Sequence, residues 1–513
     1  MKKIGFVLLA GIAMIAITGT AEAKWLRADT DSFIIYSEGS EKSLREFAQN
    51  LQRFDTTLRI LFKVATTGEE SKLPIYLVPA ANDVAELASG SSRTSIAGFY
   101  RQDRDGSFAM SFRRNGSSPA IGTSESQQVL FHEYSHHFMK RHLRAAFPAW
   151  LIEGFAEYYS TVDFDKQGRA MIGHPVYRRA YGLLQMPKIP AEKLLLEQPR
   201  TMRNSGQIDV YYGRAWILTH MLHSAARKDQ INTYTEAINA GTEPKQAAIG
   251  AFGDLAALDK ELNRYIEEKL SYGTTRDAVP ISTNIKITPL SADEDAVIMP
   301  RLERLNASGD AARLTKARDA LRKLAAAQPA NADAQFELAA AEWDMEKDER
   351  DLAAIQAALD KVLAAKPDHV RANVLLGRLK LYQLREKGED DPAAWRDARK
   401  PILLANRTDP DDAVPLYAYF DSFLAEGKRP GEMAIKALER AFTLTPENIE
   451  MRVAYAFALA NTGEFDRALR LAKTVAFDPH DNGRGDAMLA RLEAMRDRRA
   501  GDREDPTADE DAD

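Results

Sequence analysis

The sequence predicts an α+β domain, with an N-terminal mixed sheet and a helical C-terminal half, followed by an all-α helical-repeat domain. Short apolar strands and amphipathic helices occur together in residues 24–272. Residues 301–500 are instead rich in Ala, Leu, Arg and Glu, a composition typical of helices. A chain of 513 residues is also too long for one ordinary domain, so two or three domains are expected.

Composition and charge exclude several classes of protein. Hydrophobic residues make up 45% of the chain and charged residues 28%, which is the balance of a soluble protein with buried cores. A net charge of -6 gives no indication of a nucleic-acid binder. The absence of cysteine excludes disulfides, zinc ribbons, iron–sulfur clusters and cysteine nucleophiles. Any metal ion must therefore be bound by histidines and carboxylates.

Residues 1–23 are typical of an export signal peptide. Two lysines precede an apolar run over 4–17, and Ala21-Glu22-Ala23 has the pattern of a cleavage site. The run is shorter than the roughly 20 residues that a transmembrane helix needs, and no cysteine follows it to carry a lipid. We therefore expect cleavage after Ala23 and a periplasmic or secreted protein without a stable membrane anchor.

Residues 24–125 carry both helix and strand patterns. Apolar residues recur at helical spacing over 41–62. Short apolar segments bounded by turn residues predict strands at 32–36, 73–78, 97–100 and 107–112.

Residues 125–272 are predicted to be mainly helical, because apolar residues keep a helical spacing there. Helices are expected at 126–141, 150–161, 210–225 and 252–270. The following segment, 273–300, contains a glycine and several prolines and is predicted to be a linker.

Regularly placed prolines predict a repeat in the C-terminal part. They stand at 329, 367, 410, 446 and 479, so successive prolines are 38, 43, 36 and 33 residues apart, close to the period of helix-turn-helix repeats. The last unit, 456–479, resembles a tetratricopeptide repeat (TPR), with Gly463 at the turn and Ala468 where the helices touch. An irregular all-α domain is the alternative. The resemblance implies a protein partner in the repeat groove, and the acidic tail 501–513 is expected to be disordered.

The segment His132-Glu133-Tyr-Ser-His136 has the spacing of a metal site. Residues i and i+4 lie on one face of a helix, so both imidazoles can reach one ion. Glu133 follows the first histidine and can stand beside the metal as a base that activates water. The flanking residues are apolar, so the helix is expected to be buried and its polar side chains need partners.

Two carboxylates downstream extend this pattern. Glu153 comes 17 positions after His136, which leaves room for a turn and a returning helix that brings the carboxylate beneath the histidines. Two histidines and a glutamate with one open position form a catalytic zinc set, not a closed structural one. Glu157 lies one helical turn further on and suits an acceptor that fixes the tautomer of a ligand histidine. A solvated helix face is the alternative for both, but their neighbours are largely apolar.

A family resemblance rests on two segments, which read His132-Glu-x-x-His136 and Trp150-Leu-x-Glu153-Gly-x-Ala-Glu157-Tyr. They resemble the gluzincin clan of zinc metallopeptidases, and most closely the bacterial peptidase-MA-like family, which often carries TPRs. The resemblance covers roughly 30–270, although its specific motifs occupy only about 126–160. It implies Glu133 as general base and Zn2+ bound by His132, His136 and Glu153.

The resemblance also bears on specificity. Zinc aminopeptidases of this clan have a Gly-x-Met-Glu-Asn strand that binds the N-terminus of the substrate, and the strand expected at 107–112 lacks that glutamate. We therefore expect an endopeptidase in preference to an aminopeptidase, and a carboxypeptidase stays open. The same strand could pair with an extended substrate.

Gluzincins further use a Tyr or His to stabilise the oxyanion. Tyr212 is the first candidate for this role and Tyr211 the second, and an ordinary core tyrosine is the alternative for each. His137 is rotated by about 100° from His136 on a helix. It is therefore not expected to bind the metal, and neither is His142.

Three functions are consistent with these patterns. The first is a zinc-dependent peptidase with Glu133 as general base, whose repeats help to bind the protein or peptide substrate. The second is a catalytically inactive peptidase fold that serves as a TPR-type protein-binding scaffold in the cell envelope. The third is zinc-dependent hydrolysis of another amide, such as a peptidoglycan cross-link. The intact ligand set and the intact Glu133 favour the first function over the second, whereas the sequence alone does not discriminate between the first and the third.

Overall fold

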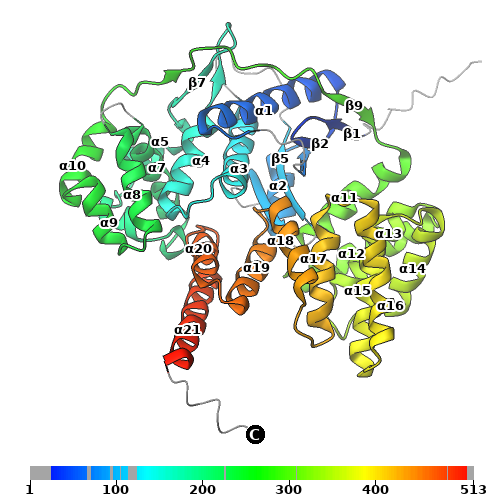
Figure 1. Ribbon diagram of the computed structural model, residues 1–513. Helices are drawn as coiled ribbons and strands as arrows, with labels where there is room; N and C mark the ends of the chain where they lie inside the picture. The colour runs from blue at the N-terminus through cyan, green and yellow to red at the C-terminus, as the bar shows by residue number, and fades with distance from the viewer. Residues whose placement is uncertain are drawn as a thin grey trace, which may run out of the picture.

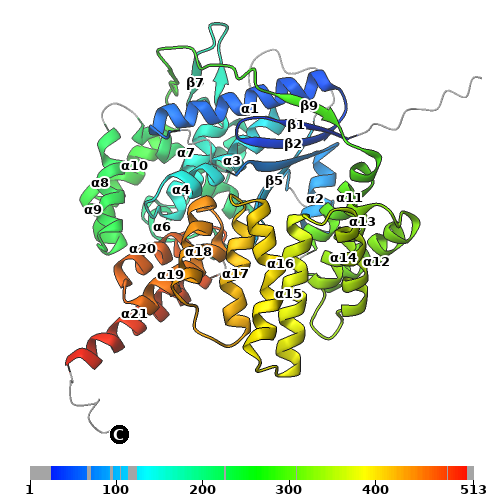
Figure 2. The same ribbon diagram turned by 45° about the vertical axis from the view of Figure 1, so that its right-hand side comes forward.

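The structure, a computed structural model, describes residues 25–65, 71–92, 96–103, 106–113, 124–223, 227–307, 309–481 and 483–504. The predicted signal peptide lies outside these residues, and so do residues 505–513 of the predicted tail. A mixed α/β part is followed by a helical part that curves beneath it, as Figure 1 and Figure 2 show. This confirms the predicted order of an α/β part and a helical part.

A six-stranded sheet forms the centre of the α/β part, in the order β4-β5-β3-β2-β1-β9. Its strands are β1 (Trp25–Asp29), β2 (Phe33–Glu38), β3 (Leu73–Val78), β4 (Gly98–Asp103), β5 (Gly106–Phe112) and β9 (Lys286–Pro289). β3 pairs in parallel with β2 and with β5, and the other pairs are antiparallel. The four predicted strands are confirmed as β2 to β5, and β4 lies at an edge of the sheet.

Helix α1 (Glu41–Phe62) supplies the crossover that the parallel β2–β3 pair needs. Ser40 caps its first turn, and its apolar stripe, which includes Leu58, is buried in the main core. Phe54 on the same stripe stacks on Phe131 with the ring centroids 4.0 Å apart. The long helix therefore holds the helix that contains Phe131 against the sheet.

The helical half of this part is built from short and long helices beside the sheet. They are α2 (Ala81–Ser89), α3 (Glu125–His142), α4 (Ala149–Ser160), α5 (Ala180–Gln185), α6 (Ala191–Leu196), α7 (Ser205–Leu222), α8 (Lys228–Asn239), α9 (Pro244–Phe252) and α10 (Leu255–Tyr265), with 3-10 turns η1 (Tyr177–Arg179) and η2 (Pro199–Thr201). The helix predicted at 252–270 needs correction, because Gly253 (φ 80°) ends α9 and Asp254 caps α10.

The segment predicted as a linker, 273–300, is joined to the α/β part by strand pairing. β8 (Gly273–Thr274) pairs with β7 (Ala170–Ile172), which also pairs with β6 (Asp163–Phe164). β9 pairs with β1 and becomes the second edge of the main sheet. The prolines that suggest a linker are compatible with this structure, because proline is tolerated in an edge strand.

The C-terminal part consists of helices that pack as antiparallel neighbours. They are α11 (Ala292–Asn306), α12 (Ala311–Ala327), α13 (Ala332–Asp344), α14 (Leu352–Ala365), α15 (Val370–Lys387), α16 (Pro392–Thr408), α17 (Ala413–Ala425), α18 (Glu432–Leu444), α19 (Ile449–Thr462), α20 (Phe465–Ala476) and α21 (Arg484–Glu504). Each of the five periodic prolines follows the end of a helix, as the spacing predicts. α21 extends into the segment predicted as a disordered tail.

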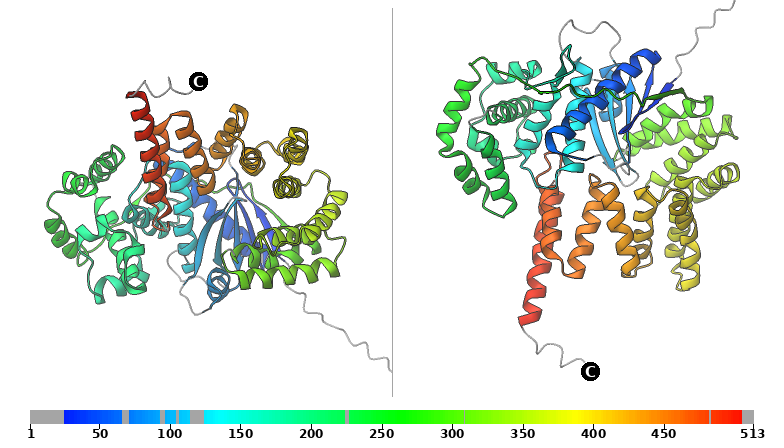
Figure 3. Two further views of the ribbon diagram at one scale, coloured as in Figure 1. Left: turned by 90° about the horizontal axis from the view of Figure 1, so that it is seen from below. Right: turned by 45° about the horizontal axis from the view of Figure 1, so that its top comes forward.

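The last repeats return to the α/β part and contact it, which the two views of Figure 3 show. Arg141 of α3 donates to Glu447 at 2.8 Å and to the backbone oxygen of Leu444 at 3.1 Å. Lys140 of the same helix pairs with Asp478 at 2.6 Å. The end of α3 is thus a docking point for the repeats. Among the described residues, no helix has the length and apolar character needed to cross a membrane.

Candidate metal centre

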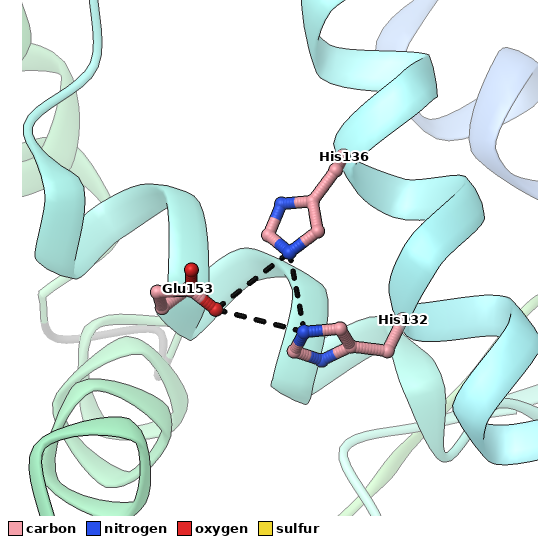
Figure 4. A group of neighbouring side chains, drawn as sticks. All are labelled: His132, His136 and Glu153. Carbon is pink, nitrogen blue, oxygen red and sulfur yellow. Dashed lines mark hydrogen bonds and ion pairs between the residues drawn. The ribbon is translucent and has the colours of Figure 1, made fainter. Parts of the chain in front are cut away.

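The described residues contain one group of side chains that could hold a metal ion, and it consists of His132, His136 and Glu153. The ligand atoms lie within 4.8 Å of one another. His132 Nε2 and His136 Nε2 are 3.1 Å apart, and Glu153 Oε2 lies 3.5 Å from the first and 3.6 Å from the second. Figure 4 shows the three side chains converging from two helices.

Local sequence determines how these helices present their side chains. The i, i+4 spacing on α3 places both imidazoles on the face that meets α4. Every residue of α4 is buried, because the helix is packed between α3 and α7. Gly154 permits this packing: a Cβ at its position would lie 2.1 Å from Thr219 Oγ1 and 2.5 Å from the backbone oxygen of Ala215. The neighbouring Glu153 is thereby held in the core.

The chemistry of the buried atoms fits a metal ion. Glu153 Oε2, the oxygen that faces the two histidines, makes no hydrogen bond of good geometry with a described residue, and the same holds for His136 Nδ1. A buried carboxylate oxygen without a compensating partner is costly. Burial lowers the pKa of both His132 and His136 to about 3, so both rings are neutral at physiological pH, the form in which histidine binds metals. The residues present therefore fit a divalent cation such as zinc.

Glu157 lies behind His132, where the sequence predicts an acceptor. Its Oε1 is 3.4 Å from His132 Nδ1. If Nε2 faces the metal, Nδ1 carries the proton and Glu157 can accept it. Glu157 also pairs with Arg178 at 2.8 Å and with Arg179 at 2.6 Å. Burial would raise the pKa of Glu157, but these two arginines outweigh it and hold the carboxylate in its charged form.

Glu133 lines a cleft of about 730 Å³, which His132 and His136 also line. It is half-buried, and burial raises its pKa to about 7. A base with a pKa near neutrality is well matched to proton transfer at physiological pH. Gly98 of β4 allows the strand to approach, since a Cβ there would lie 2.3 Å from Val129 and 3.7 Å from Glu133 Cγ.

The two candidate tyrosines have different surroundings. Tyr212 lines the cleft, with its ring centroid 6.4 Å from that of His132 and the Arg179 guanidinium 5.1 Å above its ring. Burial raises its pKa well above the usual value, so the hydroxyl stays a donor. Tyr211 is fully buried and donates to the backbone oxygen of Glu197 at 3.0 Å. Of the two, only Tyr212 is in a position to contact a substrate.

The structure also bears on the roles predicted for His137, for His142 and for the strand at 107–112. His137 points away from the group and contacts the Tyr100 hydroxyl at 2.9 Å, and His142 packs against Phe138. The prediction that the strand at 107–112 pairs with a substrate is wrong, because β5 is already paired on both sides, with β3 and with β4. Among the described strands, β4 forms the edge of the sheet next to β5, and its residues line the cleft.

Arg178 and Arg179, which pair with Glu157, were not predicted as site residues, and neither was His480. His480, on the loop between α20 and α21, places its Nε2 3.2 Å from Glu153 Oε1, and its ring centroid lies 5.5 Å from that of His136. The loop forms one wall of the cleft, together with Arg484 at the start of α21. No local pattern could have connected His480 with a glutamate so far away in the sequence.

Comparison with known proteins concerns the repeats. The tetratricopeptide repeat family model matches residues 432–492, which confirms the TPR character predicted for the last repeats. A solved structure of a thermophilic TPR protein from Thermus thermophilus is 19% identical over 40% of this chain and 98% of that chain, with a TM-score of 0.32. A TM-score this low does not establish a shared fold. No curated protein matches the chain.

Proposed function

We propose that this protein is a zinc-dependent peptidase whose cleft has one wall made by a TPR-type repeat domain. The observation that carries the proposal is the convergence of His132, His136 and Glu153, whose ligand atoms lie within 4.8 Å of one another. Two neutral imidazoles and a buried carboxylate whose Oε2 faces both of them are suited to a catalytic zinc site.

Each of the polar residues at the site has a separate role in amide hydrolysis. Zinc, when bound by these three ligands, acidifies water and polarises a carbonyl. Glu133 takes a proton from the attacking water and delivers it to the leaving amine. The Tyr212 hydroxyl donates to the oxygen on which negative charge develops. Glu157 holds His132 in the tautomer that leaves Nε2 free.

The likeness to gluzincins supports a peptide substrate. The two histidines on one helix and the glutamate on the returning helix follow the arrangement of that clan. Among the described strands, β4 forms the sheet edge that lines the cleft. An extended peptide could add to this edge by backbone hydrogen bonds. We propose an endopeptidase, because the strand at 107–112 lacks the glutamate with which zinc aminopeptidases bind the N-terminus of a substrate. Export to the periplasm or beyond remains part of the proposal.

A protein-binding scaffold without catalytic activity is the second candidate. The family match covers only repeat helices and therefore favours this candidate over the peptidase. Repeat domains of this type stack helices into extended surfaces that bind other proteins. In that case the metal group would have a structural role or none.

Metal content and turnover together distinguish the two. The chain from Lys24 to Asp513 is purified, its zinc is measured by elemental mass spectrometry, and hydrolysis of an unfolded fluorescent protein substrate is followed. The peptidase proposal expects about one zinc per chain and turnover that Glu133→Gln abolishes while zinc is retained. Glu46→Gln, on the exposed face of α1, is the matched control. Zinc-free protein, or turnover retained in Glu133→Gln, contradicts the proposal and leaves the scaffold.

A further inference from the structure

We propose that the repeat domain completes the metal centre through His480, which acts as a positioning residue for the ligand Glu153. The inference rests on the proposed zinc site and adds a requirement for the second domain. The two carboxylate oxygens of Glu153 face different side chains. Oε2 faces the two histidines at 3.5 and 3.6 Å, whereas Oε1 faces His480 Nε2 at 3.2 Å.

His480 is a partner of Glu153 and not a fourth ligand. The group of mutually close ligand atoms among the described residues contains His132, His136 and Glu153, without His480. A carboxylate oxygen can only accept, so Nε2 of His480 must carry the proton and donate it. This contact leaves Oε2 as the oxygen presented to the metal. Partners of this kind orient ligands and tune metal affinity.

The loop that carries His480 is fixed at both ends. Asp478 accepts from the backbone N–H of His480 at 3.0 Å and pairs with Lys140 at 2.6 Å. Asp481 accepts from the backbone N–H groups of Gly483 and Gly485 at 2.9 and 3.0 Å. Hydrogen bonds within the loop and one ion pair to the first domain therefore hold the described residues on both sides of His480.

The first domain holds the same loop from two elements. Lys140 belongs to α3, the helix that carries both histidines. Arg200, in η2, donates to the backbone oxygen of Asp481 at 2.7 Å and pairs with Asp486 at 2.7 Å. The position of His480 over Glu153 is thus set by contacts on either side of it. We expect zinc affinity to depend on the repeat domain, although all three ligands lie outside it.

Zinc affinity of the full chain tests this inference, measured by competition with a chromophoric chelator. His480→Ala should weaken binding by between about tenfold and a hundredfold, and His480→Gln, which keeps a donor, should recover most of the loss. The control is His369→Asn, which removes another histidine of the repeat domain but keeps the side-chain cap of α15. Its affinity should equal that of the parent.

A second measurement does not depend on affinity. With cobalt in place of zinc, the visible absorption reports the ligand geometry, and it should change in His480→Ala but not in His369→Asn. Parent-like affinity and spectrum in His480→Ala overturn the inference, and so does a loss that His480→Gln shares in full. These results leave the peptidase proposal intact as long as His136→Ala abolishes metal binding. A parent chain that binds no metal overturns both.

Discussion

Arg141, in the last turn of the helix that carries both candidate ligand histidines, forms a buried ion pair with Glu447 of the repeat domain at 2.8 Å. Both side chains are less than a tenth exposed. Removing one member of a buried pair leaves an uncompensated charge and costs about 3–5 kcal/mol. Arg141→Ala should therefore loosen the docking of the last repeats.

Hydrogen exchange measures this loosening directly. In Arg141→Ala, backbone amides of α18 to α20 should exchange faster than in the parent, and the melting temperature should fall. Lys436→Ala is the control, because its partner Glu432 is exposed and on the same helix, where such pairs contribute little. Equal exchange in the two variants would show that the Arg141 pair does not hold the domains together.

Chelation should destabilise the protein through the metal group. A ligand present at a thousand times its Kd stabilises the folded state by about 4 kcal/mol. Removal of zinc with a chelator should lower the melting temperature of the parent, whereas His132→Ala and Glu153→Gln, with impaired sites, should respond little. Calorimetric scans with and without chelator measure the difference. If the chelator does not change the melting temperature of the parent, the parent has no tightly bound zinc.

Gly154→Ala should be destabilising although alanine is the better helix former. The added Cβ would lie 2.1 Å from Thr219 Oγ1 and 2.5 Å from the backbone oxygen of Ala215, and such overpacking costs about 1–3 kcal/mol. Gly250→Ala in α9 meets no atom within 4 Å and should be neutral or stabilising. Denaturant unfolding compares the two. Because Glu153 is adjacent, zinc binding should weaken only in Gly154→Ala.

Tyr212→Phe should lower kcat by about a hundredfold to a thousandfold, the effect of losing one oxyanion donor, while zinc content stays unchanged. Tyr211→Phe is a close control. Its hydroxyl donates to the backbone oxygen of Glu197, so its loss should reduce stability and spare kcat. Steady-state kinetics with the unfolded protein substrate separate the two. Similar kcat values for Tyr212→Phe and the parent would remove Tyr212 from the mechanism.

Acid should destabilise the junction between α11 and α13 through Glu337. This buried carboxylate pairs with Arg301 at 2.5 Å and with Arg304 at 3.0 Å. Burial would raise its pKa, but the two arginines lower it below the ordinary 4.5. The stabilisation is therefore complete above about pH 4.5 and is lost as pH falls through the lowered folded-state pKa.

The free energy of unfolding, measured at neutral pH and at successively lower pH, tests this effect. In Glu337→Gln the protein should be less stable at pH 7, and its stability should fall less steeply in acid than that of the parent. Glu303→Gln, whose carboxylate is more than a third exposed, should follow the parent. If the stability of Glu337→Gln falls with decreasing pH as steeply as that of the parent, other carboxylates determine the acid sensitivity.

Local spacing explains why much of the fold could be predicted. The stripe over 41–62 matches α1, and the run at 73–78 matches β3. The geometry of His132 and His136 also follows from positions four residues apart on one helix. Glu153 could be anticipated because only a turn separates its helix from theirs.

Contacts between distant segments explain the rest. The sequence of a single strand does not determine its position in the sheet. The strand at 107–112 was therefore expected to be available to a substrate, although β4 pairs with it. The proline-containing segment 273–300 gives no sign that β9 pairs with β1 at the other end of the domain. His480 and Arg178 reach the site only through tertiary packing.

The loop that carries His480 is synthesised late, and this determines when the cleft can be completed. A chain made from its N-terminus presents His132, His136 and Glu153 long before residue 480 has been added. Until then the cleft lacks the wall that the loop of His480 and Arg484 form, and Glu153 lacks its partner. A peptidase built in this way would mature only after the loop that carries His480 has been synthesised and docked, which would spare the machinery that makes it.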